Sequence, residues 1–284
     1  MGRKLDTRAI GLDAGLKFIH WLTGAENMHY GLWDGLEVCA GNLRAAQEAY
    51  TTKLFSYLPG GKLRILDIGG GAGETAKKLI ALGHEVDIVV PSDLLAERCR
   101  ANAPKARVFQ CKFEDFTPDA KYDLCLFSES FQYVPLAKGL SGALACLKDD
   151  GEILIADCFR SPAFKGTGKA GVTGGGHPIA AFRKELDNQP VKAAAEEDIT
   201  SSVAPSIDLE QSLFNVIGYA ITRTDAELSQ KRRRTRWVLA RALSLFMNER
   251  KRLRLDQRLN EQKRNRAVFC EFNQYLILRL IRQG

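Results

Sequence analysis

The stretch Leu-Arg-Ile-Leu-Asp-Ile-Gly-Gly-Gly-Ala-Gly-Glu-Thr, residues 63–75, decides the fold of this 284-residue chain. Its first half is a short apolar run, which predicts a buried strand ending near Ile68. Four glycines follow, at positions 69, 70, 71 and 73, and a helical pattern resumes at Ala76. Glycines let the backbone turn with positive φ and let a ligand approach it closely, and the start of a helix offers unpaired N–H groups. The stretch therefore predicts a strand, a turn and a helix that suit a nucleotide-like ligand.

The spacing of the glycines distinguishes two kinds of nucleotide-binding fold. Dinucleotide-binding folds carry Gly-x-Gly-x-x-Gly, whereas Gly69, Gly71 and Gly73 give Gly-x-Gly-x-Gly, and Asp67 stands two residues before the first. This pattern resembles the first motif of class I S-adenosylmethionine-dependent methyltransferases. The resemblance implies that Asp67 ends the strand and that the three glycines face the methionine part of the cofactor. A plain strand–helix turn without a ligand is the alternative.

Strands and helices alternate along the next part of the chain. Apolar runs predict strands at 85–90, 106–110, 122–127 and 153–157, with helices at 76–82, 94–102 and 140–147 between them. This alternation predicts a doubly wound, mostly parallel sheet of Rossmann-like type. The resemblance implies seven strands, with a helical N-terminal cap at 1–58, a cofactor-binding core at 59–160, a lid loop and helical insertion at 161–266, and a last core strand at 267–284.

An aromatic cluster beside a glycine stands in the cap. The segment His29-Tyr30-Gly-Leu-Trp33 resembles one found in small-molecule methyltransferases, the group with cyclopropane fatty acid synthases, tocopherol methyltransferases and sarcosine or phosphoethanolamine methyltransferases. By that resemblance Tyr30 contacts the cofactor, and His29 lies in the substrate pocket as a candidate catalytic residue. An aromatic packing corner with a structurally bonded histidine is the alternative.

The positions that hold the adenosine in this family are altered here. Val90 stands where an acidic residue usually accepts hydrogen bonds from the ribose, and valine has no acceptor. Asp93 in the following loop is a candidate substitute. Lys112 replaces the first acidic residue of the adenine-binding segment, whereas Phe113, which would stack on the ring or present its N–H, and Glu114 fit the pattern.

The strand at 122–127 ends in Ser128-Glu129, at the sheet edge where ligands bind in such folds. Ser128 is a candidate cofactor contact. Glu129 is the preferred general base or substrate-orienting group. A simple helix cap with a solvated Glu129 is the alternative.

A glycine-rich segment, Lys165–His177, follows the fifth strand and predicts a lid loop over the same edge. His177 at its end is a third candidate catalytic residue, and a solvent-exposed linker histidine is the alternative.

Basic residues concentrate at the C-terminal end. Residues 231–284 contain 16 Lys and Arg against 4 Asp and Glu, a net charge of +12, which leaves −5 for the rest. The basic segment 231–266 is either a solvated outer face, a contact for an anionic substrate or a membrane surface, or an RNA contact. We expect no nucleic-acid partner, because the aromatic residues do not interleave with the basic ones as a stacking platform would.

The composition limits the class of protein. The apolar and charged fractions, 45% and 26%, are ordinary for a globular protein, and the seven scattered cysteines fit a reducing compartment better than a disulfide framework or a metal site. We expect a cytoplasmic enzyme without a metal and leave a homodimer open.

The implied function is methyl transfer from S-adenosylmethionine to an N, O or C nucleophile of a small molecule, with a natural product or a lipid-like compound as acceptor. The alternatives are a non-catalytic scaffold or binding protein of the same fold, or an RNA or lipid methyltransferase that uses the basic helix.

Overall fold

The computed structural model describes residues 7–166, 174–260 and 263–283. One seven-stranded sheet forms the core, in the order β3-β2-β1-β4-β5-β7-β6. Strands β1 to β5 are parallel, and β7 is antiparallel to both β5 and β6. The predicted Rossmann-like fold is confirmed. The strands are β1 (Arg64–Ile68), β2 (Glu85–Val89), β3 (Arg107–Phe109), β4 (Tyr122–Ser128), β5 (Leu147–Arg160), β6 (Val191–Asp198) and β7 (Asn273–Arg282).

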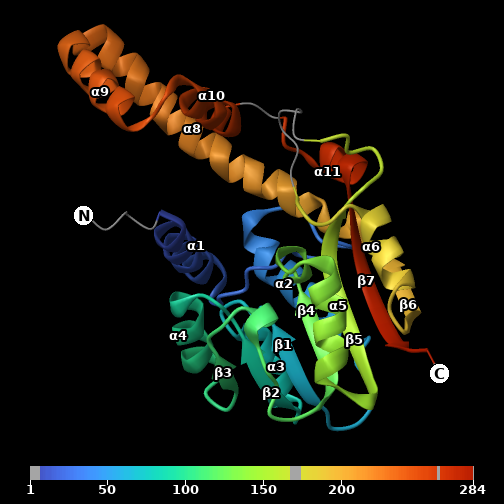
Figure 1. Cartoon of the computed structure of the whole chain (residues 1–284). Helices are drawn as coiled ribbons and strands as arrows, with labels where there is room; N and C mark the ends of the chain where they lie inside the picture. Colours follow the sequence, from blue (N-terminus) through green and yellow to red (C-terminus); the bar gives the residue numbers. More distant parts are fainter. Residues whose placement is uncertain (1–6, 167–173, 261–262, 284) are drawn as a thin grey trace.

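Helices cover both faces of this sheet, as Figure 1 shows. On one face α2, α3, α4 and α7 pack on the strands, and on the other α5 and α6 do so. The helices are α1 (Thr7–Thr23), α2 (Leu43–Phe55), α3 (Glu74–Ala81), α4 (Asp93–Asn102), α5 (Leu136–Cys146), α6 (Ile179–Asp187), α7 (Thr200–Val203), α8 (Pro205–Lys231), α9 (Arg233–Phe246), α10 (Glu249–Asn260) and α11 (Arg266–Phe272), with short 3₁₀ turns at Ala40–Asn42, Phe113–Asp115 and Phe131–Tyr133.

The main differences from the sequence-based expectation lie after residue 160. The region expected as lid and insertion, 161–266, contains α6 and β6, which pack against the sheet, so the helical insertion begins only after Asp198. The last strand was expected at 267–284, but residues 266–272 form α11, because Asn265 caps a helix there by accepting a hydrogen bond from Val268 N at 3.0 Å. Within the glycine-rich segment, 167–173 lies outside the described residues, so the expected lid is not tested there.

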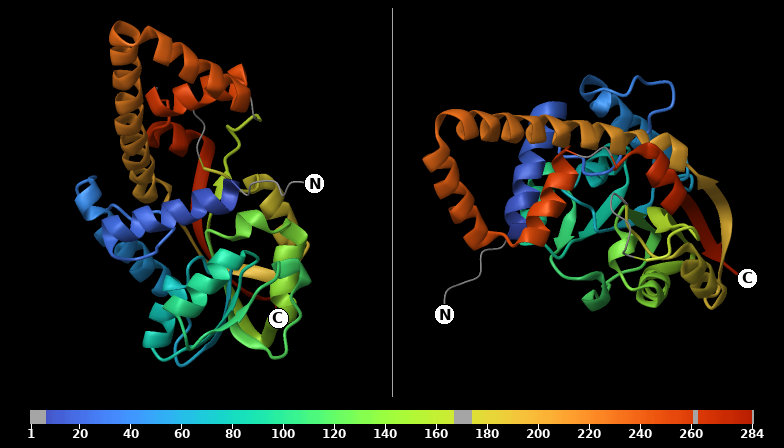
Figure 2. Two further views of the ribbon diagram at one scale, coloured as in Figure 1. Left: turned by 90° about the vertical axis from the view of Figure 1, so that its left-hand side faces the viewer. Right: turned by 90° about the horizontal axis from the view of Figure 1, so that it is seen from above.

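The insertion includes a long helical arm. The buried residues of α8 all lie in its first half, up to Gly218. The chain then folds back: α9 packs on the outer half of α8, and the end of α10 returns to its first half, where Arg258 pairs with Glu210. Both views in Figure 2 show this arm extending beyond the sheet and its covering helices. Across the described residues, no helix is both long and apolar enough to span a membrane.

Candidate active site

The glycine turn after β1 depends on close backbone contacts. Gly69 has φ of +76°, and a Cβ atom at this position would lie 2.4 Å from Cβ of Ser130. Gly73 has φ of +87° at the N-cap of α3, where a Cβ would lie 2.9 Å from Cα of Cys99. Gly71 also has a positive φ, +54°, but faces open space. The first and third glycines therefore let the chain pack closely, and the second leaves room beside the turn.

A cavity of about 460 Å³ opens beside this turn. We call it the glycine-loop cavity. Most of the residues expected to hold the cofactor line it: Asp67, Gly69, Gly71, Val90, Phe113, Glu114 and Ser128. Two do not. Gly73 packs on α4 instead, and Tyr30 lines a second cavity.

The carboxylate of Asp67 lines the cavity with an oxygen that has no hydrogen-bond donor. Its side chain is buried, and Oδ2 makes no hydrogen bond in the structure. Burial raises the pKa of this carboxyl to about 7. A buried carboxylate oxygen without a donor is costly unless a ligand supplies one. The ammonium group of an amino-acid moiety would meet this need, so the cavity fits the methionine part of S-adenosylmethionine.

The other end of the glycine-loop cavity is apolar. Val90, Pro91 and Leu95 line it, and Val90 is fully buried. Asp93, the candidate substitute for the ribose acceptor, is not in the lining, and its carboxylate accepts a hydrogen bond from Gln110 Nε2. This end can therefore hold an adenosine by shape and apolar contact, without an acidic residue at position 90.

Phe113 lies in the adenosine half as well. Its ring packs into the core, edge to face with Phe127 at 5.7 Å between centroids. A Cβ atom on Gly142 of α5 would lie 3.0 Å from this ring. The packing favours the Phe113 N–H over its ring as the contact with an adenine.

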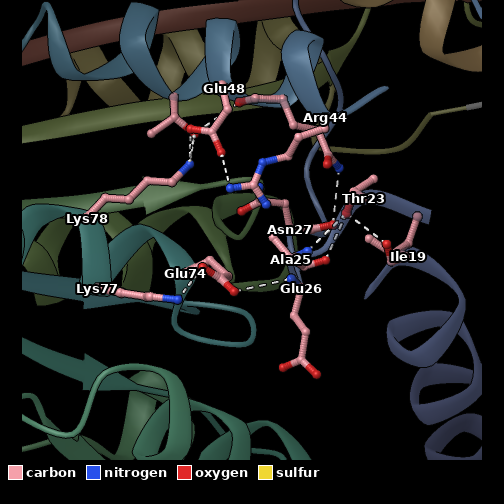
Figure 3. Close-up of polar contacts among 12 residues, drawn as sticks. Ile19, Thr23, Ala25, Glu26, Asn27, Arg44, Glu48, Glu74, Lys77 and Lys78 are labelled. Atoms are coloured by element: carbon pink, nitrogen blue, oxygen red, sulfur yellow. Dashed lines mark hydrogen bonds and ion pairs between the residues drawn. The ribbon is translucent and has the colours of Figure 1, made fainter. Parts of the chain in front are cut away.

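The segment between α1 and α2 forms a wall of the cavity. Figure 3 shows how it is tied down: Glu26 N donates to Glu74 Oε1 of α3 at 3.3 Å, and Glu48 of α2 pairs with Arg44 and Lys78 at 2.8 and 2.7 Å. These contacts join the cap to the helix that follows the glycine turn. The cap therefore closes over the cavity as one packed unit with α2 and α3.

A second cavity, of about 1220 Å³, lies on the other side of this wall. We call it the large cavity. Its lining is mostly apolar and comes from α1, the cap segment and the first half of α8. Five residues line both cavities, which marks where the two meet: Asn27, Met28, His29, Glu129 and Tyr133. The arrangement gives one compartment for a nucleotide-like ligand and a larger one for an apolar molecule.

Glu129 stands at this junction in a strained conformation. Its φ is +55°, the one positive value at a non-glycine residue in the described part of the chain. Such strain persists where the surroundings hold it, and it gathers at functional sites. Tyr30 N–H and Tyr275 OH donate to Oε1 of Glu129 at 2.8 and 2.9 Å. Oε2 takes part in no hydrogen bond and remains available at the junction of the cavities.

Burial, with the nearby charge of Asp157, raises the pKa of Glu129 to about 8. The value lies near neutral pH, where a carboxyl can both accept and release a proton. A candidate base in this position was expected from the sequence, and the geometry gives it an oriented oxygen.

Three hydroxyl groups extend from Glu129 away from the junction. Tyr275 OH contacts Tyr50 OH at 2.8 Å, and Tyr50 OH contacts Ser128 Oγ at 3.2 Å. Since Tyr275 gives its proton to Glu129, Tyr50 donates to Tyr275 and Ser128 donates to Tyr50. Burial raises the pKa of both tyrosines well above the usual range, so both remain protonated.

The two candidate histidines differ in position. His29 lines both cavities and stacks on Tyr50 at 4.5 Å between centroids. Its Nδ1 donates to the Tyr30 carbonyl at 2.8 Å, and burial lowers its pKa to about 4. Nε2 is therefore an unprotonated acceptor, and it has no partner. His177 lines neither cavity, because its Nε2 donates to the Val134 carbonyl at 2.9 Å and holds the chain after the glycine-rich segment.

Sequence reasoning missed several side chains of the site. Tyr50 and Tyr275 fall in the segments expected as the helical cap and the last strand, and the sequence analysis singled out neither of them, nor Arg264 and Glu210. The sequence carries no signal for them, since each acts through a partner far away in the chain. No group of three or more His, Cys, Asp or Glu among the described residues is arranged to hold a metal ion.

Comparisons with known proteins agree with this geometry. Residues 65–151 match a family model described as a methyltransferase domain. No curated protein has a sequence that matches the chain significantly.

Solved structures resemble the chain over most of its length. Geranyl diphosphate C-methyltransferase from Streptomyces coelicolor A3(2) has a TM-score of 0.64 at 17% identity, covering 94% of this chain and 91% of that one. The cyclopropane synthase MmaA2 from Mycobacterium tuberculosis has a TM-score of 0.66 at 15% identity, covering 92% of each chain. The [4+2]-cyclase SpnF has a TM-score of 0.66 at 14% identity, covering 97% and 94%. At these identities the likeness shows the fold alone.

Residues 65–151 are thus a methyltransferase domain in a chain that has the class I fold throughout. The expected resemblance to class I S-adenosylmethionine-dependent methyltransferases is confirmed for the fold and for the methyltransferase domain at residues 65–151.

Proposed function

We propose that this enzyme methylates an N, O or C nucleophile of a small, largely apolar molecule bound in the large cavity, and that Glu129 accepts the proton the nucleophile gives up. The observation that carries the proposal is the position of Glu129. Its Oε2 is the unpaired carboxylate oxygen at the junction of a cavity that fits the methyl donor and a larger apolar cavity.

The donor would be held by the residues of the glycine-loop cavity. Asp67 would accept from its amino group, and the backbone of Gly69 and Gly71 would lie against its methionine part. Val90, Phe113, Glu114 and Ser128 would contact the adenosine part. When bound, S-adenosylmethionine supplies an electrophilic methyl group.

The protein then acts by positioning and by proton transfer. The wall residues hold the acceptor on the far side of the junction, and the apolar lining excludes water from its reactive atom. Tyr30 N–H and Tyr275 OH fix Oε1 of Glu129, so Oε2 takes the proton of an attacking hydroxyl, amine or acidic C–H group. His29 offers a second acceptor, Nε2, which orients a polar group of the acceptor.

Neighbours of this fold support an apolar acceptor. One is a geranyl diphosphate C-methyltransferase and another a cyclopropane synthase. A natural product or a lipid-like compound is therefore the acceptor class we propose. The SpnF neighbour, a [4+2]-cyclase, shows why transfer itself has to be measured.

The test is transfer of a labelled methyl group from S-adenosylmethionine to a panel of lipophilic phenols, amines, fatty acids and prenyl compounds. For an acceptor that is turned over, Glu129→Gln should reduce kcat by about 100-fold or more, the usual contribution of a general base. Donor affinity, measured by calorimetry, should change less than threefold. Glu114→Gln is the comparison variant: as a proposed contact of the adenosine part, it should weaken donor binding but change kcat at saturating donor less than threefold. Unchanged turnover in Glu129→Gln would refute the assignment of the base.

The helical arm has a second proposed role. Residues 231–260 carry 11 basic and 2 acidic side chains, and apolar residues of α9 such as Trp237, Val238 and Leu239 are more than half exposed. Arg236 of α9 pairs with Asp225 of α8, which holds α9 on α8 while these apolar side chains stay uncovered. A second copy would bring like charge to like charge. We therefore propose that the arm contacts an anionic membrane surface, where such a helix lies in the interface.

The cellular location stays a proposal as well. All seven cysteines are free thiols, which supports a reducing compartment such as the cytoplasm.

A further inference from the structure

A charged cluster stands in the wall of the large cavity, away from Glu129. Glu210 on α8 accepts from Arg264 Nη2 at 3.0 Å and from Arg258 Nη2 at 3.4 Å. Both guanidinium groups also lie over the ring of Phe214, at 5.6 and 4.2 Å from its centroid. Two cations share one carboxylate, so the cluster keeps a net charge of +1.

Only one of these two arginines faces the cavity. Arg264 lines it together with Glu210 and Phe214, whereas Arg258 does not. The Arg264 side chain is 19% exposed, and its Nη1 is buried without a hydrogen-bond partner. A guanidinium is always charged and has five N–H donors, so a buried unpaired donor is unfavourable until an acceptor reaches it.

Tyr30 offers a second donor in the same cavity. The Tyr30 hydroxyl makes no hydrogen bond in the structure, and Tyr30 lines the same cavity. Burial and the charge of Glu129 raise its pKa far above the usual range, and the charges of Glu210 and Arg264 act on the same hydroxyl. The group therefore stays protonated and can donate. Tyr30 also donates its backbone N–H to Glu129, so one residue connects the base with the cationic end of the cavity.

Among the described residues of the lining, Arg264 is the one Lys or Arg, and other polar side chains such as Asn27, Gln132 and Ser206 are uncharged. Apolar side chains of α1 and α8 dominate the lining, among them Phe18, Ile19, Leu22, Leu209, Leu213 and Val216. The cavity therefore offers one cationic end to a ligand whose body is otherwise apolar.

We infer that the large cavity binds an amphiphile with one oxyanionic group, a carboxylate or a phosphate, and that Arg264 Nη1 is its anchor. The apolar body of the ligand fills the cavity between α1 and α8, and Tyr30 OH donates to a polar atom along it. Taken with the proposed function, on which this last step rests, the acceptor is an anionic amphiphile that presents its nucleophile to Glu129. The anion preference itself does not depend on catalysis.

The test is a calorimetric titration of the full chain without a methyl donor. Dodecanoate and dodecyl phosphate, each below its critical micelle concentration, are compared with dodecanol, which has the same chain and no charge. The wild type should bind at least one of the two anions with 1:1 stoichiometry and at least tenfold more tightly than dodecanol. Arg264→Gln should bring anion and alcohol within about twofold of each other and leave the affinity for dodecanol unchanged.

Arg258→Gln is the matched control. It removes a cation from the same carboxylate and the same ring and so makes the cluster neutral, but it leaves the Arg264 donors in the cavity, so a preference of at least threefold should remain. Arg264→Gln leaves Glu210 paired with Arg258, so we expect this variant to fold, which its circular dichroism and thermal unfolding check.

Several results would overturn the inference. The first is that the wild type binds anion and alcohol equally. The second is that Arg264→Gln still prefers the anion. The third is that Arg258→Gln loses the preference as completely as Arg264→Gln does. Inorganic phosphate alone separates a free-phosphate site from an amphiphile site: tenfold competition with dodecanoate at millimolar phosphate would refute the need for an apolar body. Glu129→Gln should retain the anion preference. If Glu129 proves not to be the base, the anion site therefore still stands, and if the anion preference is absent, the role of Glu129 is not affected.

Discussion

Glu129 gives the sharpest prediction, because its pKa makes the stability of the fold depend on pH. In an unfolded chain a glutamate titrates near 4.5, and in the folded protein Glu129 titrates near 8. Below pH 4.5 both states hold the proton, so this group contributes nothing to the pH dependence. Between pH 4.5 and 8 only the folded state holds it, and the free energy of unfolding falls as the pH rises. Above pH 8 both states are ionised, and the loss is complete.

The size of the effect follows from the shift. Each pKa unit corresponds to about 1.4 kcal/mol, so a shift of three to four units sets an upper limit of about 5 kcal/mol. Glu129 borders two cavities that solvent can enter, and this screening reduces the expected loss to about 3 kcal/mol. Glu129→Gln has no titrating group at this position and should escape the loss.

The assay is urea unfolding of the ligand-free protein, followed by circular dichroism at pH 5, 6, 7 and 8. Buried Asp67, whose pKa is raised to about 7, lowers the stability of wild type and variant alike as the pH rises. Asp157, whose pKa is also raised to about 7, interacts with Glu129, so the difference between wild type and variant reports Glu129 together with this interaction. We expect the stability of Glu129→Gln relative to wild type to rise by about 3 kcal/mol from pH 5 to pH 8. Glu114→Gln, an exposed site, should track the wild type. A constant difference between Glu129→Gln and wild type across this range would refute the raised pKa and the proton-accepting role built on it.

Two further predictions concern the glycine turn and the arm. Gly69→Ala should lower the free energy of unfolding by about 3 kcal/mol, from left-handed strain and overlap with Ser130, whereas Gly71→Ala, which meets no neighbour, should cost only about 1 kcal/mol. Urea unfolding of both variants measures this, and equal losses would contradict the packing role of Gly69. Vesicles with 30% phosphatidylglycerol should sediment the protein at low salt and release it as salt rises, and neutral phosphatidylcholine vesicles should not. Trp237→Glu should weaken this binding, whereas retention on RNA in place of vesicles would contradict the membrane contact.

The fold could be predicted from sequence where each element follows from local pattern. The sequence correctly predicts the strand before the glycines, the strands at 85–90 and 122–127 and the helices between them. Hydrophobic periodicity and turn residues decide such elements. The antiparallel β7 was recognised only through the family resemblance. Helix α11, which precedes β7, was not predicted. Its N-cap, Asn265, lies within a run of basic residues whose pattern indicates one continuous helix.

The candidate site could be predicted only where one residue acts by itself. Asp67 and Glu129 follow strands directly, so their place at the sheet edge follows from topology. Tyr275 meets Glu129 from 146 residues away, and Arg264 meets Glu210 from 54 residues away. Such pairs depend on how the insertion folds back over the cap, which no local pattern encodes. Tyr30 illustrates the limit well, since the resemblance placed it at the cofactor and its side chain lies in the other cavity.

The cap segment explains why the two cavities work as one site. His29 and Tyr30 lie at the wall between them, and Glu129 accepts the Tyr30 N–H. The hydrogen bond that orients the base therefore also fixes the wall that separates donor from acceptor. Because Ser206 of α8 accepts from Gly31 N and Trp33 Nε1 at 3.1 and 2.8 Å, the insertion is held to the same wall. An acceptor that moves α8 would thus shift the cap and, through Tyr30, the carboxylate that has to take its proton.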